Sequence, residues 1–84
     1  MADKRLYVGN LAWKVREEGL RALFADFGIV QDATVIMDRE TNRSKGFGYV
    51  EFDSAESAAR ALDELNGQDY EGRALKVSVA KRRG

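Results

Sequence analysis

Hydrophobic and polar residues alternate along four short segments of the chain, and hydrophobic residues recur at helical spacing in two others. Alternation places successive side chains on opposite faces of a strand, whereas a spacing of three and four residues gives a helix one apolar stripe. The pattern therefore predicts strands at Arg5–Gly9, Asp32–Met37, Lys45–Phe52 and Leu75–Ala80, and helices at Glu17–Phe27 and Ser54–Leu65. Their order along the chain is β-α-β-β-α-β.

The two predicted helices differ in how well the residue before each one can cap it. Arg16 stands where the first helix needs a capping side chain, and arginine is a poor cap. Ser54 or Asp53 suits the start of the second helix. Between the second and third strands we expect a polar loop, Asp38–Ser44, in which Asn42 adopts a left-handed turn.

Every predicted strand has one apolar half and one mixed half. The third strand, KGFGYVEF, shows this most clearly: Phe47 and Tyr49 share a side with Lys45 and Glu51, opposite Val50 and its neighbours. Two short helices can cover only one face of four strands, so we expect the mixed halves to face water. Aromatic residues on such a surface usually mark a binding site. Gly46 and Gly48 fall on the apolar side, where we expect them to let a helix approach the sheet.

Composition excludes several kinds of chemistry. The 84 residues include neither cysteine nor histidine, which removes thiol nucleophiles, Ser–His–Asp triads and Cys/His zinc sites. We therefore expect no enzyme, no cofactor and no metal. No apolar run approaches the ~20 residues of a membrane span, and MADKRLYV lacks the apolar stretch of a secretory signal. The sequence favours an intracellular location, with nothing to separate nucleus from cytoplasm.

The net charge is zero, but the charges are unevenly distributed. The predicted helices are mainly acidic, containing Glu17, Glu18, Asp26, Glu56, Asp63 and Glu64 against only Arg21 and Arg60. The excess of Lys and Arg therefore lies in the strands, the loops and the KRRG tail. Basic residues next to exposed aromatics are typical of a surface that binds single-stranded nucleic acid.

Two segments carry a resemblance to a known family. LYVGNL (Leu6–Leu11) and KGFGYVEF (Lys45–Phe52) resemble the two ribonucleoprotein motifs of the RNA recognition motif family. This resemblance implies an α+β, ferredoxin-like βαββαβ plait: a four-stranded antiparallel sheet of order 4-1-3-2, with both helices on one face. It implies a single domain over residues 1–84, with a core of about 5–80 and a basic tail at 81–84.

The resemblance also implies roles for particular residues. Tyr7 and Phe47 would each stack on a base, Tyr49 would pack against riboses, and Lys45 would pair with phosphate. The tail from Lys81 would cross or extend this surface. The full set of expected RNA-binding residues is Tyr7, Phe47, Tyr49, Arg5, Asn10, Lys45, Ile36, Glu51, Lys76, Ser78, Lys81, Arg82 and Arg83.

Several of these residues have a second reading. Asn10 would bond a base or complete the turn after the first strand. Ile36 would brace an aromatic ring or touch a base. Glu51 would accept from a base amino group, or hold Lys45 or Arg5 in place. Trp13, which follows the first motif and lies outside this set, is expected to cap the end of the core, with contact to a ligand as the alternative.

The expected function is binding of single-stranded RNA, with single-stranded DNA as an open alternative, by a monomeric module without catalysis. This module would stand alone or form part of a longer chain with further domains or a tail. The alternative is a protein-interaction module that uses the helical face or the sheet of the same fold. The motifs do not specify a base sequence, because every base offers a ring face to stack on.

Overall fold

The computed structural model describes residues 3–80 and contains two helices and six strands within that range. The elements are β1 (Arg5–Gly9), α1 (Glu17–Ala25), β2 (Val30–Met37), β3 (Ser44–Phe52), α2 (Ala55–Leu65), β4 (Asp69–Tyr70), β5 (Arg73–Ala74) and β6 (Lys76–Val79). The six predicted elements are all present, and no end differs by more than two residues from its predicted position.

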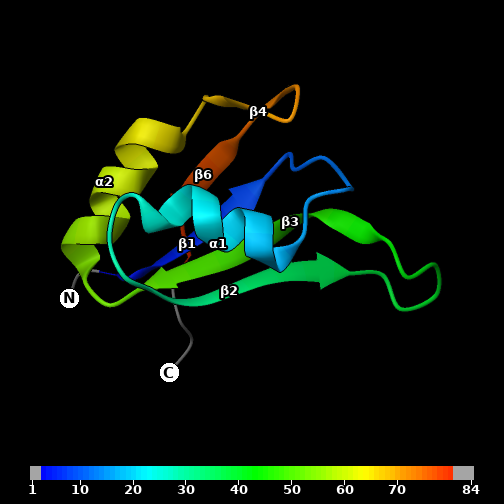
Figure 1. The fold of residues 1–84 in the computed structure, drawn as a ribbon, viewed down its shortest axis with the longest axis horizontal. Helices are drawn as coiled ribbons and strands as arrows, with labels where there is room; N and C mark the ends of the chain where they lie inside the picture. Colours follow the sequence, from blue (N-terminus) through cyan, green and yellow to red (C-terminus); the bar gives the residue numbers. More distant parts are fainter. Residues whose placement is uncertain (1–2, 81–84) are drawn as a thin grey trace.

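Four strands form one antiparallel sheet in the order β2-β3-β1-β6. With β6 as the fourth strand, this is the 4-1-3-2 order that the resemblance implied, so the predicted plait is confirmed. Both helices lie on the same face of the sheet (Figure 1). Helix α1 packs mainly against β2, and α2 contacts β1, β3 and β6. The two strands that carry the motifs, β1 and β3, are therefore neighbours at the centre.

The core lies between this face and the helices. Its largest fully buried side chains are Phe24, Phe52, Leu6, Leu20, Leu75, Val8 and Val50. The rings of Phe24 from α1 and Phe52 from β3 pack with their centroids 6.2 Å apart. No charged or polar side chain is buried among the described residues. The hydrophobic halves of the strands thus supply the core, as the alternation predicted.

The helix starts behave as the sequence indicated. Arg16 precedes α1 and its side chain makes no capping hydrogen bond. Ser54 precedes α2, and its hydroxyl accepts a hydrogen bond from the backbone N–H of Ser57. That bond satisfies one of the N–H groups that a helix start leaves without a partner.

Asn42 in the β2–β3 loop has φ 61°, the left-handed conformation expected of it.

A short hairpin was not predicted. Strands β4 and β5 pair on either side of the turn at Glu71 and Gly72, whose φ angles of 55° and 82° are both positive. Two consecutive positive φ values are typical of the tight type I′ turn that joins antiparallel strands. The hairpin matters because it carries Arg73 toward the motif strands.

The expected reason for the two motif glycines was wrong. A Cβ at Gly48 would collide with the backbone carbonyl of Thr34 in β2, rather than with a helix. Gly46 has φ 83°, and the nearest atom to a Cβ there would be the carbonyl oxygen of Leu11, at 3.4 Å. Gly48 is thus required by close approach of two strands, and Gly46 by its backbone conformation.

Two residues assigned to the apolar half are more exposed than expected. Met37 at the end of β2 is 36% exposed, and Val79 at the end of β6 is 46% exposed. The β2–β3 pairing is irregular between Val35 and Met37, which interrupts the alternation of faces. Val79 ends an edge strand of the sheet. Alternation therefore failed at the ends of β2 and β6, whereas Phe52 at the end of β3 is buried as predicted.

Candidate nucleic-acid interface

The sheet face opposite the helices carries three aromatic rings on the two central strands. Tyr7 lies in β1, and Phe47 and Tyr49 lie in β3; we call these three residues the aromatic platform. In the strand register Tyr7 is opposite Tyr49 on one side and Ser78 on the other, while Thr34 is opposite Tyr49. All three rings are partly exposed. The uncovered face is therefore aromatic in the middle, with Thr34 and Ser78 beside the platform on the two edge strands.

The rings touch one another but do not share one orientation. The centroids of Tyr7 and Phe47 are 5.7 Å apart, and their planes differ by 35°. The Phe47 and Tyr49 rings are 6.3 Å apart and almost perpendicular, at 89°. Tyr7 and Tyr49 are 5.9 Å apart in an edge-on arrangement. Tyr7 and Phe47 are thus the least inclined of the three ring pairs, and the ring of Tyr49 is steeply inclined to both.

Arg5 and Glu51 lie next to each other at the β1 start of the platform. The guanidinium carbon of Arg5 is 4.6 Å from the centroid of the Tyr49 ring, which is a cation–π contact. Glu51 is opposite Arg5 in the register, whereas Lys45 lies at the other end of β3. Of the two basic partners considered for Glu51, Arg5 is therefore the adjacent one.

Asn10 is engaged within the protein. It has φ 58°, its side-chain N–H donates to the carbonyl of Ala74 at 2.6 Å, and its side-chain oxygen accepts from the Arg73 guanidinium at 2.9 Å. Both functional atoms of the amide thus have protein partners, and asparagine tolerates the left-handed backbone better than most residues. This favours the turn-completing reading of Asn10 over direct contact with a base.

The remaining predicted residues are spread over the same face. Ile36 is partly exposed on β2, two residues beyond Thr34. Lys76 and Ser78 are exposed on β6, opposite Gly9 and Tyr7 respectively. Lys81, Arg82 and Arg83 lie outside the described residues.

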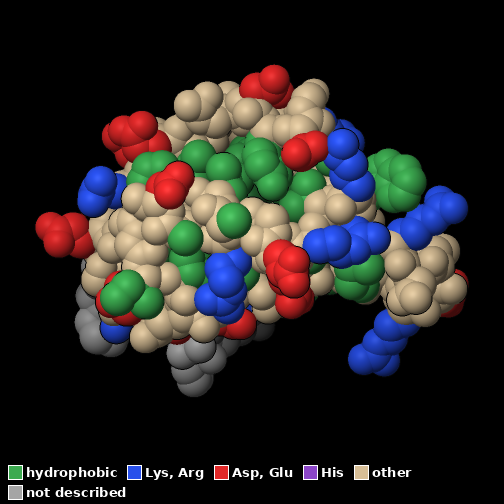
Figure 2. Space-filling model, viewed as in Figure 1, with side chains coloured by type: hydrophobic (Ala, Val, Ile, Leu, Met, Phe, Trp, Pro, Cys, Tyr) green, Lys and Arg blue, Asp and Glu red, His purple; other side chains and the backbone are tan. Residues whose placement is uncertain are grey.

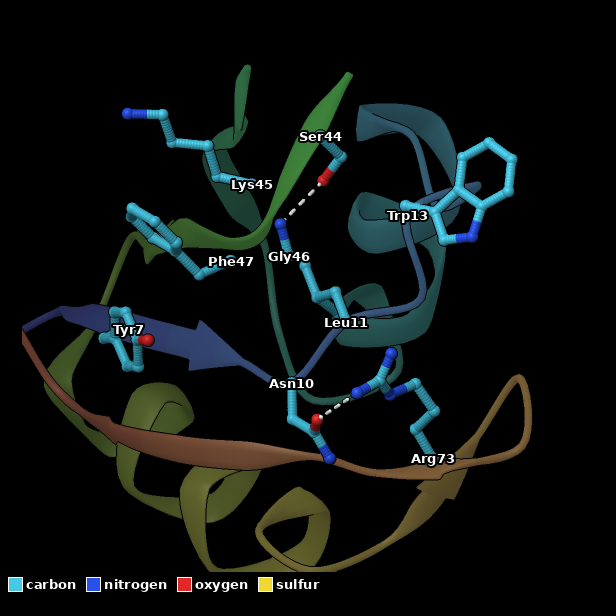
Figure 3. Close-up of a pocket in the computed structure, with 9 residues that line it drawn as sticks. All are labelled: Tyr7, Asn10, Leu11, Trp13, Ser44, Lys45, Gly46, Phe47 and Arg73. Carbon is cyan, nitrogen blue, oxygen red and sulfur yellow. Dashed lines mark hydrogen bonds between the residues drawn. The ribbon is translucent and has the colours of Figure 1, made fainter. Parts of the chain in front are cut away.

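A pocket of about 420 Å³ opens beside the platform, where β1 ends and β3 begins (Figure 3). Its lining residues are Tyr7, Asn10, Leu11, Trp13, Ser44, Lys45, Gly46, Phe47 and Arg73. We call it the loop pocket. The backbone N–H of Leu11 donates to the carbonyl of Gly46 at 2.9 Å, which joins the two motif segments at its floor.

Two residues of the loop pocket were missed or misjudged from the sequence. Trp13 was expected to cap the core, but it is 64% exposed, and the guanidinium carbon of Arg43 lies 5.9 Å from its ring centroid. That expectation was wrong because the core beneath is already closed by Leu11, Ala12 and Val15, which are buried. Arg73 had no local signal, since it reaches the site through a hairpin remote in sequence.

The hairpin is also held to the Trp13 loop by an exposed ion pair. The Lys14 ammonium lies 2.9 Å from a carboxylate oxygen of Glu71. This hydrogen bond and the attraction between the charges raise the pKa of Lys14 above its usual value. Together with the Asn10–Arg73 bond, the pair ties the β4–β5 hairpin to the loop after β1 at two points.

Two further features are absent from residues 3–80. No group of three or more Asp or Glu side chains there is placed to hold a metal ion. No helix in that range has the length and apolar character needed to cross a membrane.

Comparison with known proteins places this geometry in a family. Residues 6–76 match the family model described as RNA recognition motif. The chain is 48% identical over 82 residues to a 29 kDa chloroplastic ribonucleoprotein A of Nicotiana sylvestris, an alignment that covers 98% of this chain and 30% of that protein. The chain thus spans less than a third of this relative's length.

Solved structures agree with the sequence match. A crystal structure of RNA binding protein PG1 superimposes with a TM-score of 0.92 at 48% identity, covering 96% of this chain and 98% of that one. The structure of the Rna15 RRM with bound RNA (GU) superimposes with a TM-score of 0.86 at 31% identity, covering 95% of this chain and 85% of that one. With both motifs on adjacent central strands of the observed plait, the chain belongs to the RNA recognition motif family.

Proposed function

We propose that this chain is a single-stranded RNA-binding module that stacks bases on the aromatic platform. The observation that carries the proposal is the position of Tyr7 and Phe47: their rings are adjacent, inclined by 35° and partly exposed on the face that the helices leave open. Base–ring stacking contributes about 1–3 kcal/mol per base, which makes two accessible rings a substantial site. The RNA-bound structure among the relatives supports RNA as the ligand.

The cations around the platform supply the complementary charge. Lys45 and Lys76 are exposed at the sides of the face, and Arg5 lies over Tyr49. We assign phosphate pairing to Lys45 and Lys76 and a bracing role to Arg5, which is adjacent to Glu51. Tyr49, perpendicular to Phe47, is assigned to packing against riboses rather than to stacking.

The affinity of one such module is modest. Two stacked bases and a few phosphate contacts must offset the entropy lost on association, so we expect a Kd of roughly micromolar order. The platform sets no strong base preference. We further propose that the module acts as a monomer and inside the cell; names of relatives that include chloroplastic or mitochondrial support the second point.

The decisive test replaces one platform ring and a matched ring elsewhere. Phe47→Ala should weaken binding of a short oligouridylate about tenfold, because one stacking surface is lost, with almost no change in melting temperature. Phe27, another partly exposed phenylalanine, packs against the core on the helical side. Phe27→Ala should therefore lower the melting temperature and leave RNA affinity unchanged.

The same titration separates the alternatives. Backbone amide shifts should concentrate on β1, β3 and their edges; shifts confined to α1 and α2, or none, would contradict the proposal. A DNA oligomer of equal length and sequence pattern tests whether the ribose hydroxyl matters, since only RNA carries it. No contact described above favours the protein-interaction alternative to a similar degree.

A further inference from the structure

We propose that the loop pocket is a second nucleotide site, which takes the nucleotide next to the one stacked on Phe47. This inference rests on the proposed RNA-binding function and extends it beyond the aromatic platform. The pocket shares Tyr7 and Phe47 with the platform on one side and is bounded by Trp13 on the other (Figure 3). A chain laid over Phe47 therefore already contacts a residue that lines the pocket.

The pocket has the size and the surfaces that a nucleotide requires. Its volume of about 420 Å³ falls within the range of about 300–1,000 Å³ typical of small-molecule sites. Trp13 supplies a large aromatic ring that is 64% exposed, and tryptophan is the kind of side chain on which any base can stack. An indole so exposed contributes little to the core, so its position calls for another explanation.

The charge around the pocket suits a phosphate. Among the described residues that line it, Lys45 and Arg73 are basic and none is acidic. Arg43, over the ring of Trp13, adds a third cation at its border. Since the whole chain carries no net charge, this is a local concentration of positive charge. In Figure 2 several Lys and Arg side chains also gather toward the side that carries the β2–β3 loop.

The guanidinium of Arg73 is oriented by a hydrogen bond within the protein and is available to bind a phosphate. One of its N–H groups donates to Asn10 at 2.9 Å, and a guanidinium carries five such donors, so most remain for a ligand. Asn10 in turn donates a hydrogen bond to the carbonyl of Ala74. The Lys14–Glu71 ion pair attaches the β4–β5 hairpin to the loop after β1 at a second point. We infer that Asn10 is a positioning residue, which orients Arg73 rather than touching RNA.

The test uses a feature of the whole chain: Trp13 is its single tryptophan. The complete 84-residue chain is titrated with a uridine hexamer while tryptophan emission and backbone amide shifts are followed together. Stacking of a base on Trp13 should quench its emission in step with the amide shifts of the platform. Trp13→Ala and Arg73→Gln should each weaken binding of the hexamer about five- to tenfold, because each removes one contact.

Matched controls lie at other parts of the surface. Ile29 is 67% exposed, close to Trp13 in exposure, but lies in the turn before β2, at the opposite end of that strand from the pocket. Arg60 is exposed on α2. Ile29→Ala and Arg60→Gln should leave the affinity for the hexamer unchanged. Melting temperatures of all four variants should stay close to that of the parent chain.

The outcomes separate the two proposals. Platform amide shifts without quenching, combined with parent-like affinity of Trp13→Ala and Arg73→Gln, would overturn the nucleotide site and leave the platform proposal intact. An absence of both signals for the parent chain would overturn the RNA-binding proposal itself, and the second site with it. Quenching with weakened binding in both pocket variants, and not in the controls, would establish the site.

Discussion

The ring of Tyr7 lies over Gly9, two residues further along the same strand. A Cβ at position 9 would come within 2.7 Å of the Tyr7 hydroxyl oxygen and 2.9 Å of ring carbon Cε1. Gly9 has an ordinary backbone conformation, so glycine is needed here for space and not for its φ angle. The missing side chain at position 9 allows Tyr7 to lean along β1 and contact Phe47.

Gly9→Ala should therefore weaken RNA binding without unfolding the protein. The added methyl group meets the far end of a side chain that can rotate away, so the stability cost should be below about 1 kcal/mol. The displaced Tyr7 ring should no longer pair with Phe47, and affinity should fall about three- to tenfold. Binding by fluorescence anisotropy and thermal melting of the same sample check both parts; full affinity with a displaced ring would contradict the argument.

Gly48→Ala should have the opposite profile. Its Cβ would collide with the Thr34 carbonyl, which belongs to the backbone of β2 and cannot rotate away. The β2–β3 pairing must shift, and we expect a loss of about 2–3 kcal/mol in the free energy of unfolding. Urea denaturation measures it. A variant as stable as the parent chain would show that the two strands separate more easily than their spacing suggests.

Gly19→Ala should stabilise the chain. Gly19 lies inside α1, where glycine is about 1 kcal/mol less favourable than alanine. A new Cβ would lie 3.2 Å from the Tyr70 hydroxyl, which is the far end of a flexible side chain. We expect a gain of about 0.5–1 kcal/mol, measured by urea denaturation. A loss of stability would mean that the Tyr70 side chain cannot move away from the new Cβ.

The Lys14–Glu71 pair predicts a loss of stability at alkaline pH. Glu71 raises the pKa of Lys14, so the pair's contribution to stability is complete below the usual lysine pKa and is lost as pH rises through the raised one. Both side chains are well exposed, so the contribution is small. Glu71→Gln should return the pKa of Lys14 toward its usual value in an NMR titration of the lysine side chain. An unchanged pKa would contradict the pairing.

Lys45→Ala should reveal a phosphate contact through salt dependence. For single strands, the logarithm of the binding constant falls with the logarithm of salt concentration by about 0.7 per neutralised phosphate. Removing Lys45 should weaken binding at low salt and make that slope shallower by about 0.7. Arg21→Ala, on α1 and bonded to the Val30 carbonyl, provides the control with an unchanged slope.

The sequence was most informative where local pattern and packing agree. Strand alternation placed Leu6, Val8 and Val50 in the core and left Tyr7 and Tyr49 on the other face, because only one side of the sheet is covered. The strand order came from the resemblance, since alternation alone does not say which strands pair.

The loop pocket escaped prediction for a physical reason. Arg73 reaches it through the β4–β5 hairpin, and its link to Asn10 joins residues 63 positions apart. No periodicity reports such a contact. Trp13 did carry a signal, as a large aromatic in a loop directly after a motif, but its exposure depends on how completely Leu11, Ala12 and Val15 fill the space below.

The strict alternation along β1 has a consequence for how this sequence can vary. Leu6 and Val8 are fully buried, while Tyr7 between them faces outward. Substitutions at positions 6 and 8 should therefore affect folding, whereas substitutions at position 7 should affect RNA binding. A library of single substitutions sorted for folded protein should be depleted at positions 6 and 8 and permissive at position 7. When the same library is sorted for RNA binding, substitutions should be depleted at all three positions. None of the three central residues of this strand could then be replaced without losing either folding or RNA binding.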